Sequence, residues 1–225
     1  FIWCTIGSRH GKNIIRIKLF LFNDIVDWRS EIGRRIREQN VYAEIVPYFH
    51  SIEDIKKENP SAIILSGGPS SINDKDAPQI NNEIFNLNIP VLGICYGLYV
   101  VVKAFDGKIE SADSKEYGRA ILKCDNQSEL FQGLHDSETV WMSHGDSVAS
   151  PPEHFEVVAS SENAKIAAIQ NKEKKIYGVQ FHPEVHHTDN GVEFLRNFLS
   201  SPRTFSWNNR HSRGIRIIGF LCSDC

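Results

Sequence analysis

The chain has 225 residues, of which 41% are hydrophobic and 24% are charged, a composition ordinary for a globular fold with a sizeable core. Its 25 basic and 28 acidic residues give a formal net charge of -3, which argues against broad electrostatic binding of nucleic acid. No run of about 18 apolar residues is present, so we predict no transmembrane helix and expect a cytoplasmic protein.

Short apolar segments alternate with amphipathic segments between residues 18 and 105. They predict strands at 18–22, 41–46, 62–65 and 90–94, and helices at 29–39, 51–58, 78–86 and 96–105. This alternation is typical of a parallel sheet that helices cover on both faces.

Beyond residue 108 the strands become shorter and turn residues separate them. They are predicted at 120–123, 139–142, 155–159, 165–170 and 176–181, before a final helix at 190–199. We therefore predict an α/β fold with an open, mostly parallel sheet and a small antiparallel portion in the C-terminal half. No internal repeat or low-complexity linker divides the chain, which favours a single domain.

The five cysteines are an odd number and are scattered along the chain. The one close pair, Cys222 and Cys225, has no second pair at the spacing of a zinc site. We therefore expect neither a metal site nor a disulfide framework, and we interpret most of these thiols as unreactive.

One cysteine lies in a distinctive setting, the sequence Gly-Ile-Cys-Tyr-Gly between a predicted strand and a predicted helix. Glycines on both sides of Cys95 permit the tight turn that exposes a nucleophile above the edge of a sheet. The positive end of the helix dipole also favours a thiolate there. A small cysteine buried beneath a helix is the structural alternative.

A second segment ends a predicted strand at His182, with Pro183 and Glu184 following. In extended backbone, which proline favours, residues two apart point to the same side. One ring nitrogen can then face a thiol while the carboxylate orients the other side of the ring. A histidine that makes one structural hydrogen bond at a strand end is the alternative.

A glycine-rich loop, Ser66 to Ser71, follows the predicted strand at 62–65. Such loops expose backbone N–H groups to anions, and this one resembles the phosphate loop of ATP pyrophosphatases. Ser70 stands where that loop has aspartate, however, and Pro69 removes an amide donor. We therefore favour an oxyanion hole with the Gly68 amide facing the developing charge, and keep a plain turn as the alternative.

In this order, Gly-Gly-Pro at 67–69, Gly-Ile-Cys-Tyr-Gly at 93–97 and Gly-Val-Gln-Phe-His-Pro-Glu at 178–184 resemble the class I, or triad-type, glutamine amidotransferases. Segments at 34–42, 115–118 and 140–146 resemble, within that family, the glutaminase domain of GMP synthases. The resemblance covers residues 19–199 and implies the flavodoxin-like fold of the family. Residues 1–18 match nothing, and residues 200–225 are an unmatched candidate for a mobile tail.

The resemblance also implies the roles of individual residues. Cys95 is expected to be the nucleophile, His182 the general base and then acid, and Glu184 the carboxylate that orients the ring. The amides of Gly68 and Tyr96 are expected to form the oxyanion hole. Glutamine is expected to be held by Gly67, Tyr99, Ser143, His144 and Asp146.

The implied reaction is hydrolysis of glutamine to glutamate and ammonia through a γ-glutamyl thioester, with no cofactor or metal. The ammonia is expected to serve an ATP-pyrophosphatase (GMP synthetase) domain or subunit, which uses ATP and Mg²⁺ to aminate XMP to GMP. The chain has no Ser-Gly-Gly-x-Asp-Ser loop of its own, so this partner is expected to lie outside the 225 residues. No nucleic-acid or membrane partner is expected.

Two positions depart from the family pattern. Tyr99 stands where the family has a glutamine that helps to hold the substrate, and a phenol offers one donor in place of an amide with two. Asn23 to Asp27 stand where the family has a Gly-Ser-Gln loop. These departures leave two alternatives open: a catalytically weakened regulatory or interaction module, and a stand-alone hydrolase of γ-glutamyl compounds.

Overall fold

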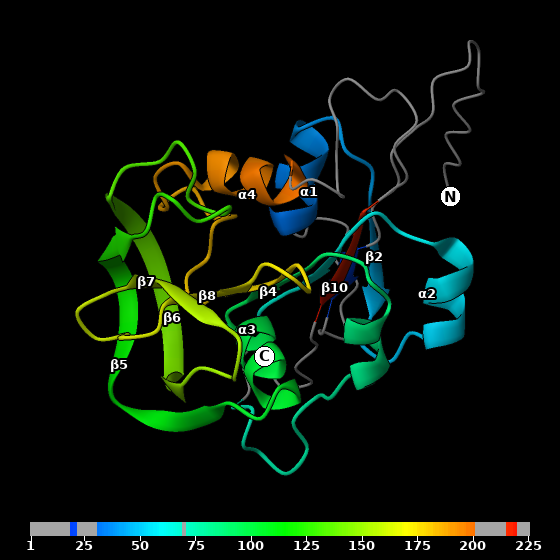
Figure 1. Ribbon diagram of the computed structural model, residues 1–225, viewed down its shortest axis with the longest axis horizontal. Helices are drawn as coiled ribbons and strands as arrows, with labels where there is room; N and C mark the ends of the chain where they lie inside the picture. Colours follow the sequence, from blue (N-terminus) through cyan, green and yellow to red (C-terminus); the bar gives the residue numbers. More distant parts are fainter. Residues whose placement is uncertain (1–18, 22–30, 69–70, 201–214, 220–225) are drawn as a thin grey trace.

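The computed structural model describes residues 19–21, 31–68, 71–200 and 215–219, with only the backbone described at 19–21, 112–114 and 215–219. Its first half alternates strands and helices, and its second half is mostly antiparallel strands (Figure 1). In chain order the elements are β1 (Leu19–Leu21), α1 (Glu31–Glu38), β2 (Ala43–Pro47), α2 (Ile52–Glu58), β3 (Ile63–Leu65), the 3₁₀ helix η1 (Asn82–Asn86), β4 (Val91–Ile94), α3 (Tyr96–Ala104), β5 (Lys108–Cys124), β6 (Ser137–Ser150), β7 (Glu156–Ser160), β8 (Ala168–Asn171), β9 (Ile176–Val179), α4 (Gly191–Ser200) and β10 (Ile215–Gly219).

The strands form a parallel part and an antiparallel part that meet at β4. Strands β1, β2, β10 and β3 run parallel in one closed group, and the Ile63 amide at the start of β3 donates to the Pro90 carbonyl just before β4. The second group has the order β4-β9-β8-β7-β5-β6, in which only β4 and β9 are parallel. The predicted α/β class, with parallel strands and an antiparallel C-terminal portion, is confirmed.

Two features of the sheets differ from the sequence expectation. The antiparallel portion is not small, because β5 and β6 are continuous strands of 17 and 14 residues that pair along most of their length. Strand β10 lies within the segment interpreted as an unmatched tail, where it pairs in parallel with β3 and β2. Ser200 at the start of that tail is the last residue of α4, and residues 201–214, 220–225 and 1–18 lie outside the described residues.

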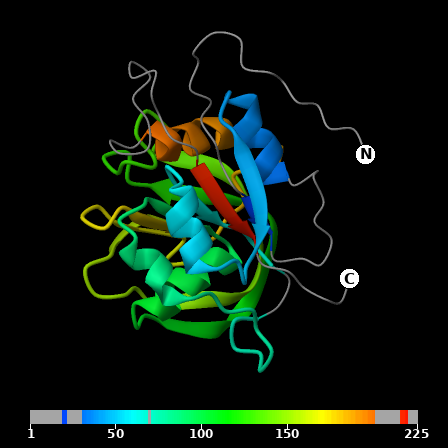
Figure 2. The same ribbon diagram turned by 90° about the vertical axis from the view of Figure 1, so that its right-hand side faces the viewer.

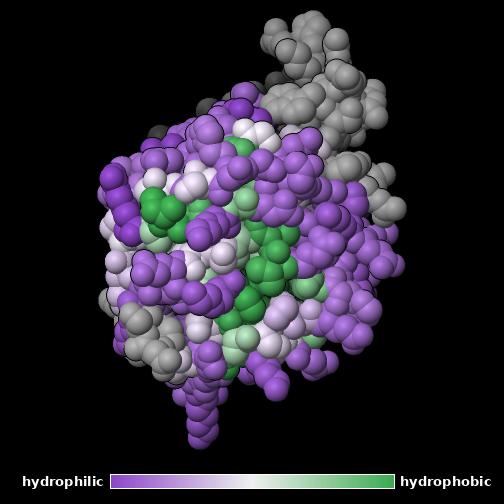
Figure 3. Space-filling model, turned by 60° about the vertical axis from the view of Figure 1, so that its left-hand side comes forward, coloured by the Kyte–Doolittle hydropathy of each residue, from purple (hydrophilic) through white to green (hydrophobic). Residues whose placement is uncertain are grey.

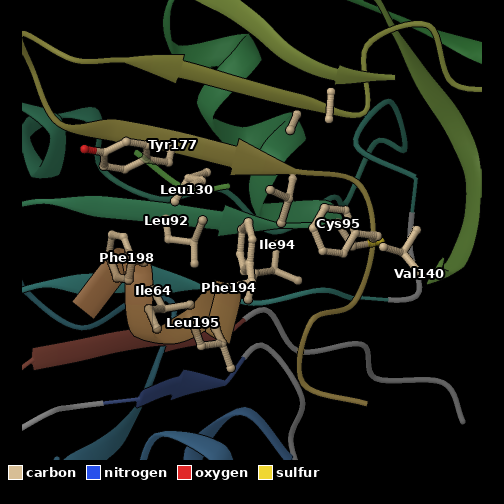
Figure 4. Packing of buried hydrophobic residues seen from close by; sticks show 14 of the residues in the cluster. Ile64, Leu92, Ile94, Cys95, Leu130, Val140, Tyr177, Phe194, Leu195 and Phe198 are labelled. Carbon is tan, nitrogen blue, oxygen red and sulfur yellow. The ribbon is translucent and has the colours of Figure 1, made fainter. Parts of the chain in front are cut away.

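Helices cover both faces of the sheets, as the alternation predicts. Helices α1 and α4 lie beside each other on one face, and α2, η1 and α3 lie on the other (Figures 1 and 2). Each set packs on its own buried apolar cluster. Figure 4 shows the first cluster, in which Leu92 and Ile94 of β4 face Phe194 and Phe198 of α4. Cys95 lies at the end of this cluster, directly after β4.

The helix expected at 78–86 forms only the short 3₁₀ helix η1. Its N-cap is Asn81, whose side chain accepts a hydrogen bond from the Glu83 amide, and asparagine favours such a start over a helix interior. The Pro78 carbonyl, which the expected helix would have used in its first turn, accepts a hydrogen bond from the Tyr96 hydroxyl at 2.8 Å. The segment before η1 is thus held by a tertiary contact that its own sequence does not predict.

None of the described helices is long and apolar enough to cross a membrane. The side of the molecule that carries β5 and β6 is mostly hydrophilic, with apolar groups gathered near its centre (Figure 3). Large apolar side chains that are exposed among the described residues include Ile121 of β5 and Val157 of β7.

Candidate active site

Cys95 occupies a strained turn between β4 and α3. Its φ of 53° and ψ of -105° lie in a region that residues other than glycine rarely adopt. Its amide donates to the Val179 carbonyl at 2.7 Å, and its carbonyl accepts from the Leu98 amide at 3.0 Å, so both flanking elements hold the turn. The cysteine is therefore the first residue above the carboxyl end of β4 and the cap of α3.

The turn requires the two glycines of the motif, because a side chain at either position would collide with neighbouring backbone. A Cβ on Gly93 would lie 2.3 Å from the Gly97 carbonyl oxygen. A Cβ on Gly97 would lie 2.2 Å from the carbonyl oxygen of Leu65 in β3. Strand and helix approach each other too closely for any other residue, which gives the Gly-x-Cys-x-Gly spacing its physical reason.

His182 and Glu184 face each other just beyond β9. The ring Nδ1 lies 2.8 Å from Glu184 Oε1, so the carboxylate holds the ring by one of its nitrogens. The backbone around the pair is also held, because the His182 amide donates to Trp141 and the Thr188 hydroxyl donates to the His182 carbonyl. Arg35 of α1 donates to the Glu184 carbonyl at 2.9 Å.

Cys95 and His182 are neighbours across Gly67. A Cβ built on Gly67 would lie 3.2 Å from His182 Cε1 and 3.5 Å from Cys95 Cβ, so the glycine sits against both residues. Burial by itself lowers the pKa of His182, but the charges and hydrogen bonds of Glu184 and Cys95 outweigh it and raise that pKa well above the usual range. The three groups therefore follow the order thiol, imidazole and carboxylate, in which a base lies beside a nucleophile and a third group orients the base.

A cavity of about 800 Å³ opens at Cys95, within the range of small-molecule sites. Seven of the residues that the sequence singles out line it: Gly68, Cys95, Tyr99, Ser143, His144, Asp146 and His182. The other lining residues are Ser71, Asn73, Asp74, Ser111, Lys115, Tyr117 and Gly145. Three singled-out residues lie behind this surface: Gly67 between cysteine and histidine, Glu184 beyond the ring, and Tyr96 in the first turn of α3.

Tyr99 forms one wall of the cavity and leaves it open. Its buried hydroxyl donates to the backbone carbonyl of Asp146 at 2.5 Å. Burial, with the nearby charges of Cys95 and Asp146, raises the pKa of this phenol far above its ordinary value, so it stays a neutral donor. The Tyr99 side chain therefore supports the β6 segment that faces Cys95.

Several residues of the site carry little signal in the sequence. Ser71 donates its hydroxyl to the Asp146 carboxylate at 2.5 Å, and Glu116 contacts the His144 ring at 3.2 Å. The Gln180 amide lies 4.0 Å from Cys95 Sγ. Glu116 and Gln180 do occur in segments that carry the family resemblance, but only the folded chain assigns them partners. The loop at 23–27 lies outside the described residues.

Comparison with known proteins identifies the family. Residues 25–201 match the family model described as glutamine amidotransferase class-I. The chain is 51% identical over 179 residues to the GMP synthase [glutamine-hydrolyzing] of Brachyspira hyodysenteriae, covering 78% of this chain and 35% of that protein. It is 55% identical over 168 residues to the enzyme of the same name from Caldanaerobacter subterraneus, covering 75% and 33%. The chain thus spans about a third of the length of these curated relatives.

Solved structures agree with this assignment. A Thermoplasma acidophilum protein described as one of the subunits of a GMP synthase has 26% identity and a TM-score of 0.69, with 85% of this chain and 94% of that chain covered. A glutamine amidotransferase from Thermotoga maritima shares the fold at 20% identity and a TM-score of 0.62, with 84% and 82% covered. The turn at Cys95, the histidine beside it and the match along most of the sequence lead to one conclusion: the chain belongs to the class I glutamine amidotransferase family.

Proposed function

We propose that this chain hydrolyses glutamine to glutamate and ammonia at Cys95. The observation that carries the proposal is the group formed by Cys95, His182 and Glu184 at one end of an open cavity. The raised pKa of His182 favours a protonated ring beside the Cys95 sulfur, which places a proton donor next to the proposed nucleophile.

The proposed reaction begins when the Cys95 thiolate attacks the side-chain amide carbon of glutamine. The C–N bond of the resulting tetrahedral intermediate breaks as His182 donates its proton to the leaving nitrogen, which departs as ammonia and leaves a γ-glutamyl thioester. His182 then takes a proton from water, the hydroxide attacks the thioester, and glutamate leaves as the thiolate re-forms. We assign stabilisation of the oxyanion to the amides of Gly68 and Tyr96.

We assign the remaining cavity residues to the ends of glutamine that do not react. Ser143, His144 and Asp146 lie on the strand that faces Cys95, and the Ser143 carbonyl is 3.5 Å from the Cys95 sulfur. A carboxylate at Asp146 suits the α-ammonium group of the substrate. Tyr99 and Gly67 would shape the wall along which the side-chain amide enters.

We propose that the ammonia is consumed by an ATP-pyrophosphatase domain or subunit that aminates XMP to GMP. The support is sequence similarity: this chain is 51% and 52% identical to two relatives named GMP synthase [glutamine-hydrolyzing]. It covers 35% and 33% of their lengths, which leaves room in those proteins for a further domain. ATP and Mg²⁺ would be needed in that partner, and no cofactor is needed for the glutaminase step.

The test is substitution of Cys95→Ala in the chain assayed with its GMP synthetase partner, XMP, ATP and Mg²⁺. Glutamine-dependent formation of glutamate and GMP should fall by about 10³-fold or more, because the covalent step is lost. GMP formation from added ammonium chloride should persist, since the partner supplies that step.

Cys124→Ala is the matched control, because this half-buried thiol of β5 lies outside the cavity. It should keep the wild-type rate of glutamate formation. Absence of glutamine hydrolysis by the wild-type chain with its partner would contradict the proposal. Glutamine hydrolysis that survives Cys95→Ala would contradict the assignment of the nucleophile.

A further inference from the structure

A buried carboxylate, Glu116 of β5, lies behind the wall of the cavity and belongs to none of the groups assigned above. It is 8% exposed and pairs across the strands with His144 of β6. Its Oε2 lies 3.2 Å from His144 Nε2. The Ser161 hydroxyl donates to the same carboxylate at 3.3 Å, and the Asn163 amide donates to it at 3.4 Å.

The other nitrogen of the His144 ring lies 2.8 Å from the backbone carbonyl of Asp146. Because a carbonyl only accepts, Nδ1 carries the hydrogen of this contact, and Nε2 is the nitrogen that faces the Glu116 carboxylate. With both nitrogens engaged, the ring cannot turn without losing a hydrogen bond. Glu116 is therefore one of the two groups that hold the His144 ring in its orientation.

The Asp146 carbonyl is held from two sides, by the His144 ring and by the Tyr99 hydroxyl. The side chain of Asp146 is held separately by the Ser71 hydroxyl. These contacts join β5, β6, α3 and the loop after β3 around one residue of the cavity wall. The contact from His144 depends on its ring keeping its place, and Glu116 is the buried partner of that ring on β5.

We propose that Glu116 is a positioning residue for substrate binding, which acts through His144 to hold Asp146 where it meets the α-ammonium group of glutamine. The inference rests on the proposed function and extends it, since Glu116 does not line the cavity and touches no reacting atom. Loss of the carboxylate should weaken binding of glutamine and leave the reactivity of the Cys95 thiolate as it is.

The test is Glu116→Gln, which keeps the size of the side chain and removes its charge. With the synthetase partner present, the KM for glutamine should rise about 10-fold while kcat stays within about 2-fold, because a hydrogen bond to a charged group is lost from the binding wall and not from the chemistry. Alkylation of Cys95 provides a second readout. Iodoacetamide, which has no α-amino group, should label at the wild-type rate, whereas 6-diazo-5-oxo-L-norleucine, a glutamine analogue, should label about 10-fold more slowly.

Glu138→Gln is the matched control. Glu138 is an equally buried carboxylate on β6 that accepts from the His135 amide and the Asn190 side chain, away from the cavity. Its substitution should lower the free energy of unfolding in urea as Glu116→Gln does, without changing the KM or the ratio of the two alkylation rates. If Glu116→Gln does not fold, Glu116→Asp can replace it, because it keeps the charge on a shorter side chain that no longer reaches His144 as well. It should likewise raise the KM for glutamine while leaving kcat nearly unchanged.

An unchanged KM and analogue rate in a folded Glu116 variant would overturn the inference. So would equal slowing of both reagents, because that would indicate a general structural role. These outcomes are distinct from failure of the proposed function, in which the wild-type chain with its partner would hydrolyse no glutamine at all.

Discussion

His182 lies between a carboxylate and a thiol, and both neighbours favour the protonated ring. Glu184 contacts Nδ1, and the charge of Cys95 and its hydrogen bond with the ring also raise the pKa of His182. Their combined effect outweighs the burial that would lower the pKa of His182. The folded protein therefore binds this proton more tightly than the unfolded chain does.

This difference predicts a pH dependence of stability. A raised histidine pKa contributes stability that is fully present below the unfolded value of about 6.5 and is lost as the pH rises through the raised folded value. His182→Gln should therefore cost more unfolding free energy at about pH 6 than at about pH 9, as measured by urea denaturation at each pH.

A second histidine offers a control of opposite sign. Desolvation, followed by the charges of His186 and Arg119, lowers the pKa of His187, which stacks on Trp141. A lowered histidine pKa destabilises the folded chain as the pH falls, so His187→Gln should gain stability relative to the wild type at about pH 6 compared with about pH 9. Equal pH dependence of the two variants would contradict the assigned interactions.

Among the elements, helix α3 packs so closely against β3 that the junction of β4 and α3 accepts no side chain at Gly97. Gly97 meets the backbone of Leu65, which cannot move aside as the end of a flexible side chain can. The contact also holds Cys95 in its strained turn, because the helix begins directly after it.

Gly97→Ala should therefore lower the free energy of unfolding by about 3 kcal/mol, at the upper end of the usual cost of overpacking. Glutaminase activity should fall with it, since the turn must open. Gly145→Ala is the comparison, because its new Cβ would meet only the flexible side chain of Lys115 at 3.6 Å or more. That variant should stay within about 0.5 kcal/mol of the wild type in urea titrations. Similar losses in both variants would show that the close approach to β3 is not the limiting contact.

At the scale of the whole molecule, one apolar cluster joins the parallel and antiparallel parts. It contains Ile36 of α1 and Ile64 of β3 together with Leu122 of β5, Met142 of β6 and Phe198 of α4, all fully buried. Because the two groups of strands share this core, we expect them to unfold as one cooperative unit.

Cys124 of β5 provides a probe of this expectation. Burial, followed by the charges of Glu138 and Asp136, raises the pKa of its thiol to about 12, so it should react slowly with iodoacetamide in the folded chain. Labelling of Cys124, followed by peptide mass spectrometry, should begin at the urea concentration at which the circular dichroism of the helices is lost. Labelling at clearly lower urea would show that the antiparallel part opens by itself.

Much of the fold could be predicted from the sequence because its elements have strong local signals. The apolar run at 62–65 and the amphipathic helix at 29–39 are set by residues close in the chain, and they form β3 and α1. The length of β5 and the pairing of β10 could not be predicted in this way, because both depend on partners far along the chain. The segment before η1 depends in the same way on a distant residue, because the hydroxyl of Tyr96 holds the Pro78 carbonyl.

The sequence by itself determined the family, the α/β class and the residues that form the turn at Cys95 and the histidine–carboxylate pair, because each of these is encoded by neighbours along the chain. Only the tertiary structure brought Cys95 and His182 together across Gly67 and linked Glu116 through His144 to Asp146. The physical reason is separation along the chain. Contacts between residues from β3, β4, β5, β6 and β9 form only when the sheets and their helices bury a common core, and no local pattern records which side chains then meet.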